Sequence, residues 1–391
     1  MVVIFYGTSA ELIKMLGIVR RIPRSELFFI CTAQHRKGLI RLHPQIGIEP
    51  DVYLSDGWRG GDVVTMKQML VMMLVAHTRF ARKFWKIKRQ IKAHDAKHGT
   101  KSVAVVHGDT LTTVAGSYLG RFLGLPIAHV EAGLRSGIWN NPFPEELDRR
   151  IAAKFARIHF PPNNTAEQSL RSERVKGDIV NTQFNTAKDA IEMSGEFVSE
   201  DFHKLVLPKK YCLVLLHRTE LIENKANLEA ILKVVRDHAS PKTPVVFVEH
   251  STTLQKINSY GFQHYLEKPG LTVIPKQPYF DFMVVVGNAD YIVTDGGGLQ
   301  EDAYFFGIPT MIHRRTTERD EGLGHNADIS RMDTKKVVKF LEHHPDKSEF
   351  AALRHDVSPS QIVVDYFLEH KYIDRKLDKW QTNPKNSRAS S

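Results

Sequence analysis

Residues 102–135 read SVAVVHGDTLTTVAGSYLGRFLGLPIAHVEAGLR, and this stretch decides the fold. Residues 102–107 and 126–131 are apolar runs with the length of buried strands. Residues 112–123, which lie between them, have the apolar spacing of a helix. A strand, a helix and a second strand in this order are typical of a βαβ unit, whose parallel sheet is covered on both faces.

The same alternation of strands and helices continues on both sides of this unit. It pauses at residues 195–210, GEFVSEDFHKLVLPKK, which are polar and charged and contain Pro208, so we interpret them as a linker between two domains. We predict an α/β fold of two Rossmann-like domains that face each other across a cleft. One long doubly wound sheet is the alternative. Further strand candidates are residues 2–6, 27–32, 158–160, 211–216, 244–249, 271–274 and 291–294, and a further helix candidate is residues 11–20.

The expected domain boundaries follow from that pause. We expect the first domain at residues 1–195 and the second at residues 211–358. Residues 359–375 begin with a helical stretch that is expected to cross back onto the first domain, and residues 376–391 form a polar tail that is expected to be frayed. Ligands of such domains bind beyond the carboxyl ends of the strands, so the residues that follow each strand are the functional candidates.

The composition is that of a globular protein with a basic excess. The chain has 391 residues, of which 42% are hydrophobic, and its 54 Lys and Arg exceed its 44 Asp and Glu by a formal charge of +10. This excess is compatible with nucleic acid, an anionic membrane or an anionic small ligand. The two cysteines lie in apolar runs, which excludes a disulfide framework and a cysteine-based metal site. The start of the chain lacks the basic region of a signal peptide. The longest apolar run, residues 69–76, is too short to span a bilayer, so we expect a cytoplasmic protein.

Residues 79–92 combine seven basic side chains with interleaved aromatic and aliphatic ones. Such a stretch can bind nucleic acid or a membrane surface. It is more often an amphipathic helix whose apolar face is buried and whose basic face is solvated, and we favour that interpretation. We therefore expect neither nucleic acid nor a membrane as partner. The sequence also lacks zinc-ligand spacing and the signatures of serine or cysteine nucleophiles, so we expect no metal site.

Three acidic residues follow strand ends or begin a helix. Asp109 follows the first strand of the quoted unit, Glu131 ends the second, and Glu145 opens the next helical stretch. We expect these three carboxylates to point into one cleft, because the carboxyl ends of parallel strands meet at one edge of a sheet. Carboxylates that lie close together shift one another's pKa, which suits general acid and base catalysis. The alternative is that each one caps a helix or pairs with a nearby arginine.

A glycine triplet follows the strand candidate at residues 291–294. Gly296, Gly297 and Gly298 are expected to begin a helix and to expose backbone N–H groups at its positive end, which is a natural site for a diphosphate. A carboxylate one turn later, Glu301 or Asp302, is placed to accept ribose hydroxyls. The spacing matches neither a dinucleotide fold nor a Walker A loop, and a tight turn alone would also explain the triplet.

Basic groups of the second domain lie near the expected phosphate site. His217 and Arg218 come directly after residues 211–216, where they can bind phosphate, and His217 can protonate a leaving phosphate oxygen. A structural role for His217 is an equally good interpretation. Arg319 provides a further cation.

Together these segments resemble the UDP-N-acetylglucosamine 2-epimerase family, which has a two-domain fold of the GT-B type. The most specific match is HVEAGLR at residues 129–135, followed by PEE at residues 144–146. Further matching blocks are GT at residues 7–8, ELIKM at 11–15, TAQHR at 32–36, HGDT at 107–110, HR at 217–218, DGGGLQE at 295–301 and TER at 317–319. The resemblance covers most of the chain apart from the polar tail.

The resemblance implies roles for individual residues. Asp109, Glu131 and Glu145 match the catalytic carboxylates of the family, and His217 matches a histidine near the diphosphate. The positions expected to bind the substrate or its nucleotide are Lys14, Arg149, Gln277, Phe282, Gly296, Gly297, Gly298, Asp302 and Arg319. A regulatory substrate site of bacterial members corresponds in part to Gln34, Arg218 and His250.

The resemblance also implies a reaction. The family inverts carbon 2 of a UDP-amino sugar: UDP is eliminated, a 2-acetamidoglucal forms, carbon 2 is reprotonated from the other face, and UDP or water then adds. The expected product is N-acetylmannosamine, bound to UDP or released, and neither a cofactor nor a metal is needed. A homodimer is expected, because dimers are usual in the family. A GT-B glycosyltransferase and an inactive nucleotide-sugar sensor are the alternatives.

The sequence departs from the family pattern at several positions. Ser9 stands where an arginine usually meets the nucleotide diphosphate, Gly296 replaces a usual serine, and Asp302 replaces a usual glutamate. HDVSPSQ at residues 355–361 occupies the approximate place of the usual NPYGDG stretch. Loss of one arginine–phosphate contact costs on the order of a few kcal/mol, which is enough to change substrate affinity.

Overall fold

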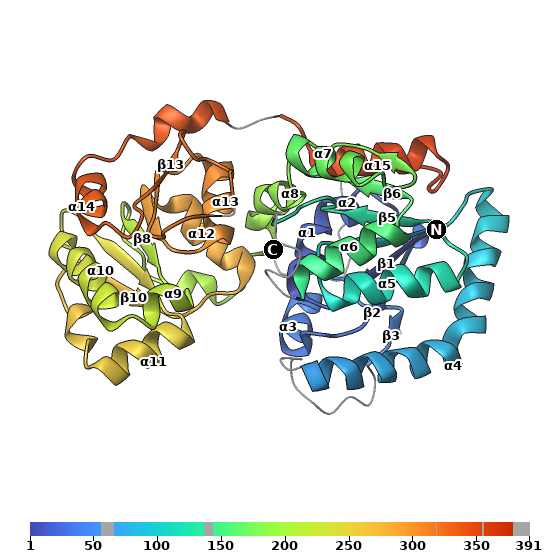
Figure 1. Cartoon of the computed structure of the whole chain (residues 1–391), viewed down its shortest axis with the longest axis horizontal. Helices are drawn as coiled ribbons and strands as arrows, with labels where there is room; N and C mark the ends of the chain where they lie inside the picture. The colour runs from blue at the N-terminus through green and yellow to red at the C-terminus, as the bar shows by residue number, and fades with distance from the viewer. Residues whose placement is uncertain (56–65, 137–143, 318, 354–355, 378–391) are drawn as a thin grey trace, which may run out of the picture. The chain divides into compact units, whose positions relative to one another are not determined.

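The computed structural model describes residues 1–55, 66–136, 144–317, 319–353 and 356–377. It divides into two compact units, each built on one parallel β-sheet with helices packed around it (Figure 1). Unit 1 comprises Met1–Ala190 and Val357–Ser391, and unit 2 comprises Ile191–Asp356. The predicted α/β class is confirmed, and the alternative of one long sheet is wrong.

Unit 1 contains a seven-stranded parallel sheet in the order β3-β2-β1-β4-β5-β6-β7. Its strands are β1 (Val2–Tyr6), β2 (Leu27–Cys31), β3 (Val52–Tyr53), β4 (Val103–His107), β5 (Ile127–Val130), β6 (Ile158–Phe160) and β7 (Asp178–Ile179). The chain proceeds outward from β1 on one side and from β4 on the other, so the strand order reverses between these two strands. Proteins of this class bind ligands beside such a reversal, at the carboxyl edge of the sheet.

Helices flank this sheet, and every residue of β1 and β4 is buried. They are α1 (Ser9–Lys14), α2 (Leu16–Arg20), α3 (Arg36–Ile46), α4 (Met66–His98), α5 (Leu111–Phe122), α6 (Glu145–Phe155), α7 (Asn164–Ser172) and α15 (Pro359–Glu369), with the 3-10 turn η1 (Arg24–Glu26). A further helix, α8 (Ala187–Glu192), crosses the boundary between the units. The helix expected at residues 11–20 is divided at Met15, which ends α1 and precedes α2.

The basic stretch at residues 79–92 lies within α4, a helix of 33 residues. Phe80, Ile87 and Ile91 are buried in the unit 1 core, whereas Trp85 is 75% exposed. These exposures confirm the amphipathic helix that the sequence predicts. In the part of the chain that the structure describes, no helix is both long and apolar enough to cross a membrane.

The chain returns to unit 1 through α15, which packs against α2. The backbone N–H of Ser360 donates to the buried carboxylate of Asp189 at 2.7 Å. Gly17 of α2 permits this close approach, because a Cβ atom at residue 17 would lie 2.4 Å from Ser360 Oγ. Most of the expected polar tail, residues 378–391, lies outside the described residues.

Unit 2 contains a six-stranded parallel sheet in the order β10-β9-β8-β11-β12-β13. Its strands are β8 (Cys212–Leu215), β9 (Val245–Val248), β10 (Leu271–Ile274), β11 (Tyr291–Thr294), β12 (Thr310–Ile312) and β13 (Ala327–Ile329). Its helices are α9 (Thr219–Ile222), α10 (Lys225–His238), α11 (Ser251–Tyr260), α12 (Tyr279–Asn288), α13 (Gly297–Phe306) and α14 (Thr334–Glu342), with the 3-10 segments η2 (Ser194–Phe197), η3 (Phe202–Lys204), η4 (Gln263–Tyr265) and η5 (Lys347–Leu353). The strand order reverses between β8 and β11, so the residues that follow these two strands lie beside the reversal.

Residues 195–210, which we predicted to be a linker, belong to unit 2 instead. The ring of Phe197 packs against Phe280 of α12 with centroids 4.8 Å apart, and the backbone N–H of Ser199 donates to Asp281 at 2.8 Å. Three more apolar side chains of this stretch pack against the unit 2 core: Phe202, Leu205 and Leu207. The prediction of a linker was wrong, because the few apolar residues in this polar stretch are sufficient to pack it against α12 and the unit 2 core.

Candidate functional site

The residues predicted to be functional fall into two groups, one in each unit. In unit 1, Asp109 follows β4 and Glu131 follows β5, and the pairing of His107 with Val130 aligns the two strand ends. Glu145 begins α6, which packs against α5 and β5. Asp109 and Glu131 therefore lie at the same edge of the sheet.

Asp109 is paired with Arg149 of α6. The Arg149 Nε donates to Asp109 Oδ2 at 2.8 Å, and Nη2 donates to the same oxygen. Arg149 Nη1 also lies 3.5 Å from Oε2 of Glu146, a fully buried carboxylate. The Asp109 side chain is still 29% exposed, so a ligand can reach the carboxylate while this pair is formed.

Two nitrogen atoms lie close to one oxygen of Glu131. Lys14 Nζ, at the end of α1, is 2.6 Å from Glu131 Oε2, and His107 Nε2 is 3.3 Å from the same oxygen. The backbone φ angle of Glu131 is +63°, which is uncommon for a residue other than glycine. Strained backbone of this kind is concentrated at functional sites. Lys14, which the resemblance assigns to the nucleotide, thus contacts a candidate catalytic residue.

Glu145 and Asp148 lie one turn apart on α6. Glu145 Oε2 is buried and has no hydrogen-bond partner among the described residues. The pKa of Asp148 is raised to about 7 by burial and by the nearby carboxylates of Asp109 and Glu145. Asp148 is not among the residues predicted from the sequence, although its spacing of three residues from Glu145 places both on one face of a helix. Three acidic side chains are therefore electrostatically coupled in unit 1.

Glu11 joins α1 to the loop that carries Asp109. Its Oε2 accepts hydrogen bonds from the backbone N–H groups of Gly7 at 2.9 Å and Thr8 at 2.8 Å. Its Oε1 accepts the Thr110 hydroxyl at 2.6 Å. The carboxyl is fully buried, and this desolvation raises its pKa. This role of Glu11 could not be predicted from the sequence, because only the fold brings Thr110 to it.

Ser9 lies at the start of α1, close to α3. Its Oγ is buried and makes no hydrogen bond within the described residues. A Cβ atom at Gly38 of α3 would lie 2.5 Å from Ser9 Oγ. In this chain α3 therefore occupies space directly beside residue 9.

In unit 2, His217 and Arg218 follow β8 and are anchored by the buried carboxylate of Asp295, which follows β11. The backbone N–H groups of His217 and Arg218 each donate to Asp295 at 2.9 Å. His217 Nδ1 lies 3.3 Å from Asp295 Oδ1, and the imidazole ring lies 5.1 Å from that of His250. The His217 side chain is 33% exposed, so it can contact a ligand.

The glycine triplet forms the start of α13. Gly296 is the N-cap and Gly297 is the first helical residue, so the backbone N–H groups at this end lack intrahelical partners. A Cβ atom at Gly296 would lie 2.6 Å from Cε1 of His217, so glycine allows the imidazole to lie against the backbone. A Cβ atom at Gly298 would meet no described atom within 4 Å. Close packing therefore requires glycine at residue 296 but not at residue 298.

Gln300 of α13 fastens the loop that carries Arg319. The Gln300 amide nitrogen donates to the carbonyl oxygens of Arg319 at 3.0 Å and Glu321 at 2.9 Å, and its amide oxygen accepts the Thr317 hydroxyl at 2.8 Å. Arg319 Nη1 lies 2.7 Å from Glu301 Oε2, so the guanidinium is held beside α13. Residue 318, part of the predicted TER block, lies outside the described residues.

The remaining nucleotide candidates have varied surroundings. Burial and the nearby charges of Asp302 and Glu301 hold the pKa of Tyr279 well above its usual value. Gln277 Nε2 donates to the carbonyl oxygen of Pro275 at 2.7 Å. Phe282 is partly buried and packs against the unit 2 core, which gives it a structural role within that unit.

The three regulatory candidates do not belong to one unit. Gln34 lies in unit 1, where its Oε1 accepts the Thr112 hydroxyl at 3.2 Å. Arg218 and His250 lie in unit 2, where His250 Nδ1 is 2.8 Å from Thr252 Oγ1 and burial lowers the pKa of the imidazole. A regulatory site made of all three residues stays a prediction from the resemblance.

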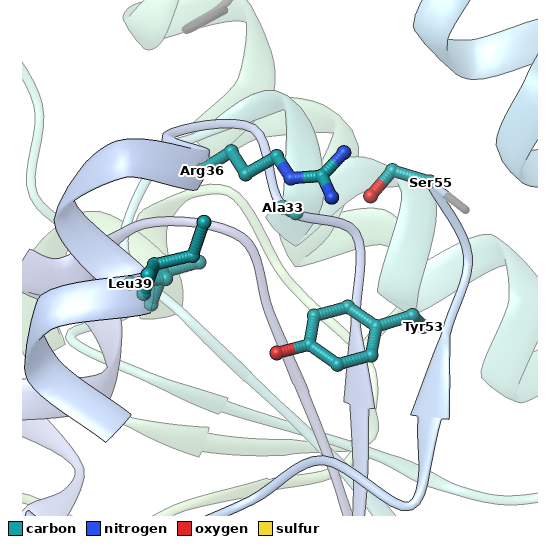
Figure 2. A pocket seen from close by; sticks show the side chains of 6 residues that line it. Ala33, Arg36, Leu39, Tyr53 and Ser55 are labelled. Atoms are coloured by element: carbon teal, nitrogen blue, oxygen red, sulfur yellow. The ribbon is translucent and has the colours of Figure 1, made fainter. Parts of the chain in front are cut away.

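Unit 1 also contains a pocket of about 200 Å³ beside α3. Figure 2 shows Arg36 extending from α3 toward Ser55, with the ring of Tyr53 nearby. The residues that line it are Ala33, Arg36, Leu39, Ile40, Tyr53 and Ser55. The pocket is separate from the acidic group, because no predicted site residue lines it. Within the described ranges, no group of three or more His, Cys, Asp or Glu side chains is arranged to hold a metal ion.

Comparison with known proteins adds an independent observation to this geometry. The sequence profile of the UDP-N-acetylglucosamine 2-epimerase family matches residues 19–359. The chain belongs to this family. The resemblance drawn from the motifs of the two domains is thereby confirmed.

Relatives in the 2-epimerase family align along nearly the whole chain. The UDP-N-acetylglucosamine 2-epimerase of Bacillus subtilis is 30% identical over 93% of this chain and 94% of that protein. The one of Methanococcus maripaludis is 29% identical over 87% of this chain and 90% of that protein. A crystal structure of a UDP-N-acetylglucosamine 2-epimerase is 26% identical, covers 97% of this chain and 98% of its own, and has a TM-score of 0.72. The Methanocaldococcus jannaschii structure, at 23% identity and a TM-score of 0.71 over 93% of this chain and 99% of its own, shares the fold.

Proposed function

We propose that this chain is a UDP-N-acetylglucosamine 2-epimerase, which inverts carbon 2 of UDP-N-acetylglucosamine or of a closely related UDP-amino sugar. The observation that carries the proposal is the acidic group at the carboxyl edge of the unit 1 sheet, in a chain of the 2-epimerase family. This group combines two carboxylates paired with cations, Asp109 and Glu131, with an acid of raised pKa, Asp148. Inversion needs both a base and an acid, which such a combination supplies.

The proposed reaction is an elimination followed by a re-addition. One carboxylate takes the proton from carbon 2 while the bond between carbon 1 and UDP breaks, which leaves a 2-acetamidoglucal and UDP. A carboxylic acid then returns a proton to carbon 2 from the opposite face, and UDP adds back to carbon 1. Addition of water in place of UDP would release N-acetylmannosamine.

We assign the acid and base roles to Asp109, Glu131 and Glu145. Asp148 lies on the same helix as Glu145, and its pKa of about 7 allows it to hold or release a proton at neutral pH. Arg149 and Lys14 balance the charges of the two carboxylates that they contact. These six residues all belong to unit 1, so its sheet edge can organise the chemistry at carbon 2.

We assign the diphosphate of UDP to unit 2. At the N-terminal end of α13, Gly297 and Gly298 offer backbone N–H groups that favour an anion, whereas the N–H of Gly296 donates to the Thr294 hydroxyl at 3.0 Å. His217 lies against Gly296 and is the proposed proton donor to the departing UDP, and Arg319 adds a cation beside the same helix. Because Ser9 replaces an expected arginine, binding of the diphosphate would depend more strongly on these unit 2 groups.

We further propose that the protein is a homodimer and acts in the cytoplasm, as the resemblance implies. Size-exclusion chromatography with light scattering tests the assembly. A mass close to twice that of the chain, which is 44.5 kDa, would support it, and a mass equal to the single chain would refute it.

Incubation of the purified protein with UDP-N-acetylglucosamine, followed by NMR of the sugars, tests the proposed activity. A UDP-bound or released N-acetylmannosamine supports the proposal. A glycosyltransferase would transfer the N-acetylglucosamine unit with carbon 2 unchanged, and an inactive sensor would bind the substrate and return it unaltered. Either of those outcomes would refute the proposal. The relatives named above are all 2-epimerases, which favours this function over glycosyl transfer.

A further inference from the structure

We propose that His107 and His129 are positioning residues, each of which holds the catalytic carboxylate that follows the neighbouring strand. His107 ends β4 and lies close to Glu131, which follows β5. His129 lies in β5 and binds the loop that places Asp109 after β4. The inference rests on the proposed function, because it adds two residues to the same unit 1 site.

His107 is aimed at Glu131 from inside the core. Its side chain is 4% exposed, and its Nε2 lies 3.3 Å from Glu131 Oε2. This Nε2 has no regular hydrogen-bond partner among the described residues. Hydrogen bonds at catalytic groups are often long in structures without substrate and shorten in the complex. Together with Lys14, which contacts the same oxygen, His107 restricts the orientation of a carboxylate whose backbone is already strained.

His129 holds the other carboxylate through the backbone. Its Nε2 lies 2.8 Å from the carbonyl oxygen of Gly108, the residue before Asp109. Because a carbonyl only accepts, the hydrogen of the imidazole is on Nε2. The N–H of Gly108 donates to the carbonyl of Val130 at 2.9 Å, and Gly108 has a φ of +65°. The turn that carries Asp109 is thus bound to β5 by one side chain and one backbone group.

Both imidazoles act as neutral donors. Burial lowers the pKa of His107 to about 4, with Glu131 opposing and Lys14 adding to the shift. Burial lowers the pKa of His129 to about 3, and the nearby His159 and His107 contribute. A neutral histidine supplies a rigid N–H group without adding charge to a site that already holds two cations. These two histidines should therefore contribute no titration to the pH dependence of turnover near neutral pH.

Substitutions at residue 107 separate positioning from packing. His107→Met fills a similar volume without a donor, so we expect kcat to fall about 10- to 100-fold with little change in KM. The acidic limb of the pH profile should move to higher pH, because Glu131 loses a donor that favours its charged form while Lys14 stays. His107→Gln places an amide N–H at about the reach of Nε2 and should restore most of the activity. His107→Asn is too short to do so and should behave like His107→Met.

His159→Met is the matched control. His159 lies in β6, pairs in register with His129, and is equally buried, but its Nε2 lies 3.2 Å from the carbonyl of Lys176 rather than from the acidic group. We expect this variant to lose thermal stability as His107→Met does, while kcat and the pH profile stay unchanged. His129→Met should lower kcat through the Asp109 turn, and His129→Gln should recover part of the loss.

The experiment compares kcat, KM, pH profiles and melting temperatures of the wild type and these variants. The inference would be overturned if His107→Met and His159→Met lowered kcat equally. It would also be overturned if His107→Met kept full activity with an unshifted pH profile. If His107→Met does not fold, the contrast between His107→Gln and His107→Asn decides the question instead, and equal activities would overturn it. If the wild type itself fails to epimerise the substrate, the proposed function fails and the inference fails with it.

Discussion

Asp148 links the charges of the unit 1 site to the stability of the protein. Its pKa is raised from 3.8 to about 7 by burial and by Asp109 and Glu145. Between these pH values the folded chain keeps a proton on Asp148 that the unfolded chain has released. The wild type therefore has its full stability from this group below pH 4 and loses it as the pH rises to about 7. In the Asp148→Asn variant the side chain at residue 148 is uncharged at any pH, so this variant should not lose that stability as the pH rises.

The magnitude follows from the size of the shift. At about 1.4 kcal/mol per pH unit, the full difference between 3.8 and about 7 corresponds to roughly 4 kcal/mol. Solvent reaches the neighbouring Asp109, whose side chain is 29% exposed, and screens part of its charge, so we expect about half of this, roughly 2 kcal/mol. The variant and the wild type should differ little at pH 4.5, and at pH 8 the variant should be the more stable by about that amount.

Urea unfolding of both proteins at pH 4.5 and pH 8 measures this difference. Asp365→Asn is the control, because it also removes one negative charge from unit 1 but at a half-exposed position on α15. A stability difference between Asp148→Asn and wild type that is the same at both pH values would refute the reasoning. The same variant should lose at least about tenfold in kcat if Asp148 exchanges protons with the catalytic acids.

Three further predictions concern residues of both units. Asp109→Asn and Glu131→Gln should each lower turnover by at least about 100-fold while calorimetry still shows UDP binding, and loss of UDP binding in both would indicate structural roles. Gly296→Ser introduces the serine usual in the family and would place Cβ 2.6 Å from His217 Cε1. It should displace the imidazole ring and lower kcat about tenfold, and an unchanged kcat would contradict the observed packing. Arg319→Gln should weaken UDP binding about tenfold by calorimetry, and an unchanged Kd would remove Arg319 from the diphosphate site.

The buried strands could be predicted from the sequence, and with them the location of the site. Val2–Tyr6 and Val103–His107 are apolar on both faces, which distinguishes them from helices and from solvent-exposed strands. Once such strands are identified, the residue after each one lies at the carboxyl edge by topology alone, as Asp109 and Glu131 do. The strands β3, β7, β12 and β13 were missed, because runs of two or three residues give only a weak periodic pattern, and of the strands this short only β6 was predicted.

Contacts between distant segments could not be predicted in the same way. The pairing of Arg149 with Asp109 depends on how α6 packs beside the loop after β4, and no local pattern encodes that packing. The same holds for Asp148, whose raised pKa requires both burial and the approach of two other acids. The sequence shows His107 within the HGDT block, but its distance from Glu131 could not be predicted, because that distance depends on the register between β4 and β5.

Deuterium exchange at carbon 2 is the direct test of whether this protein removes and returns the proton at that carbon. The purified protein is incubated with UDP-N-acetylglucosamine in deuterium oxide, and the recovered sugars are examined by NMR. We expect deuterium at carbon 2 of the N-acetylmannosamine product, and none in a parallel reaction with Glu131→Gln. A product that keeps its original hydrogen at carbon 2, or a substrate that is recovered unlabelled and unchanged, would contradict the account.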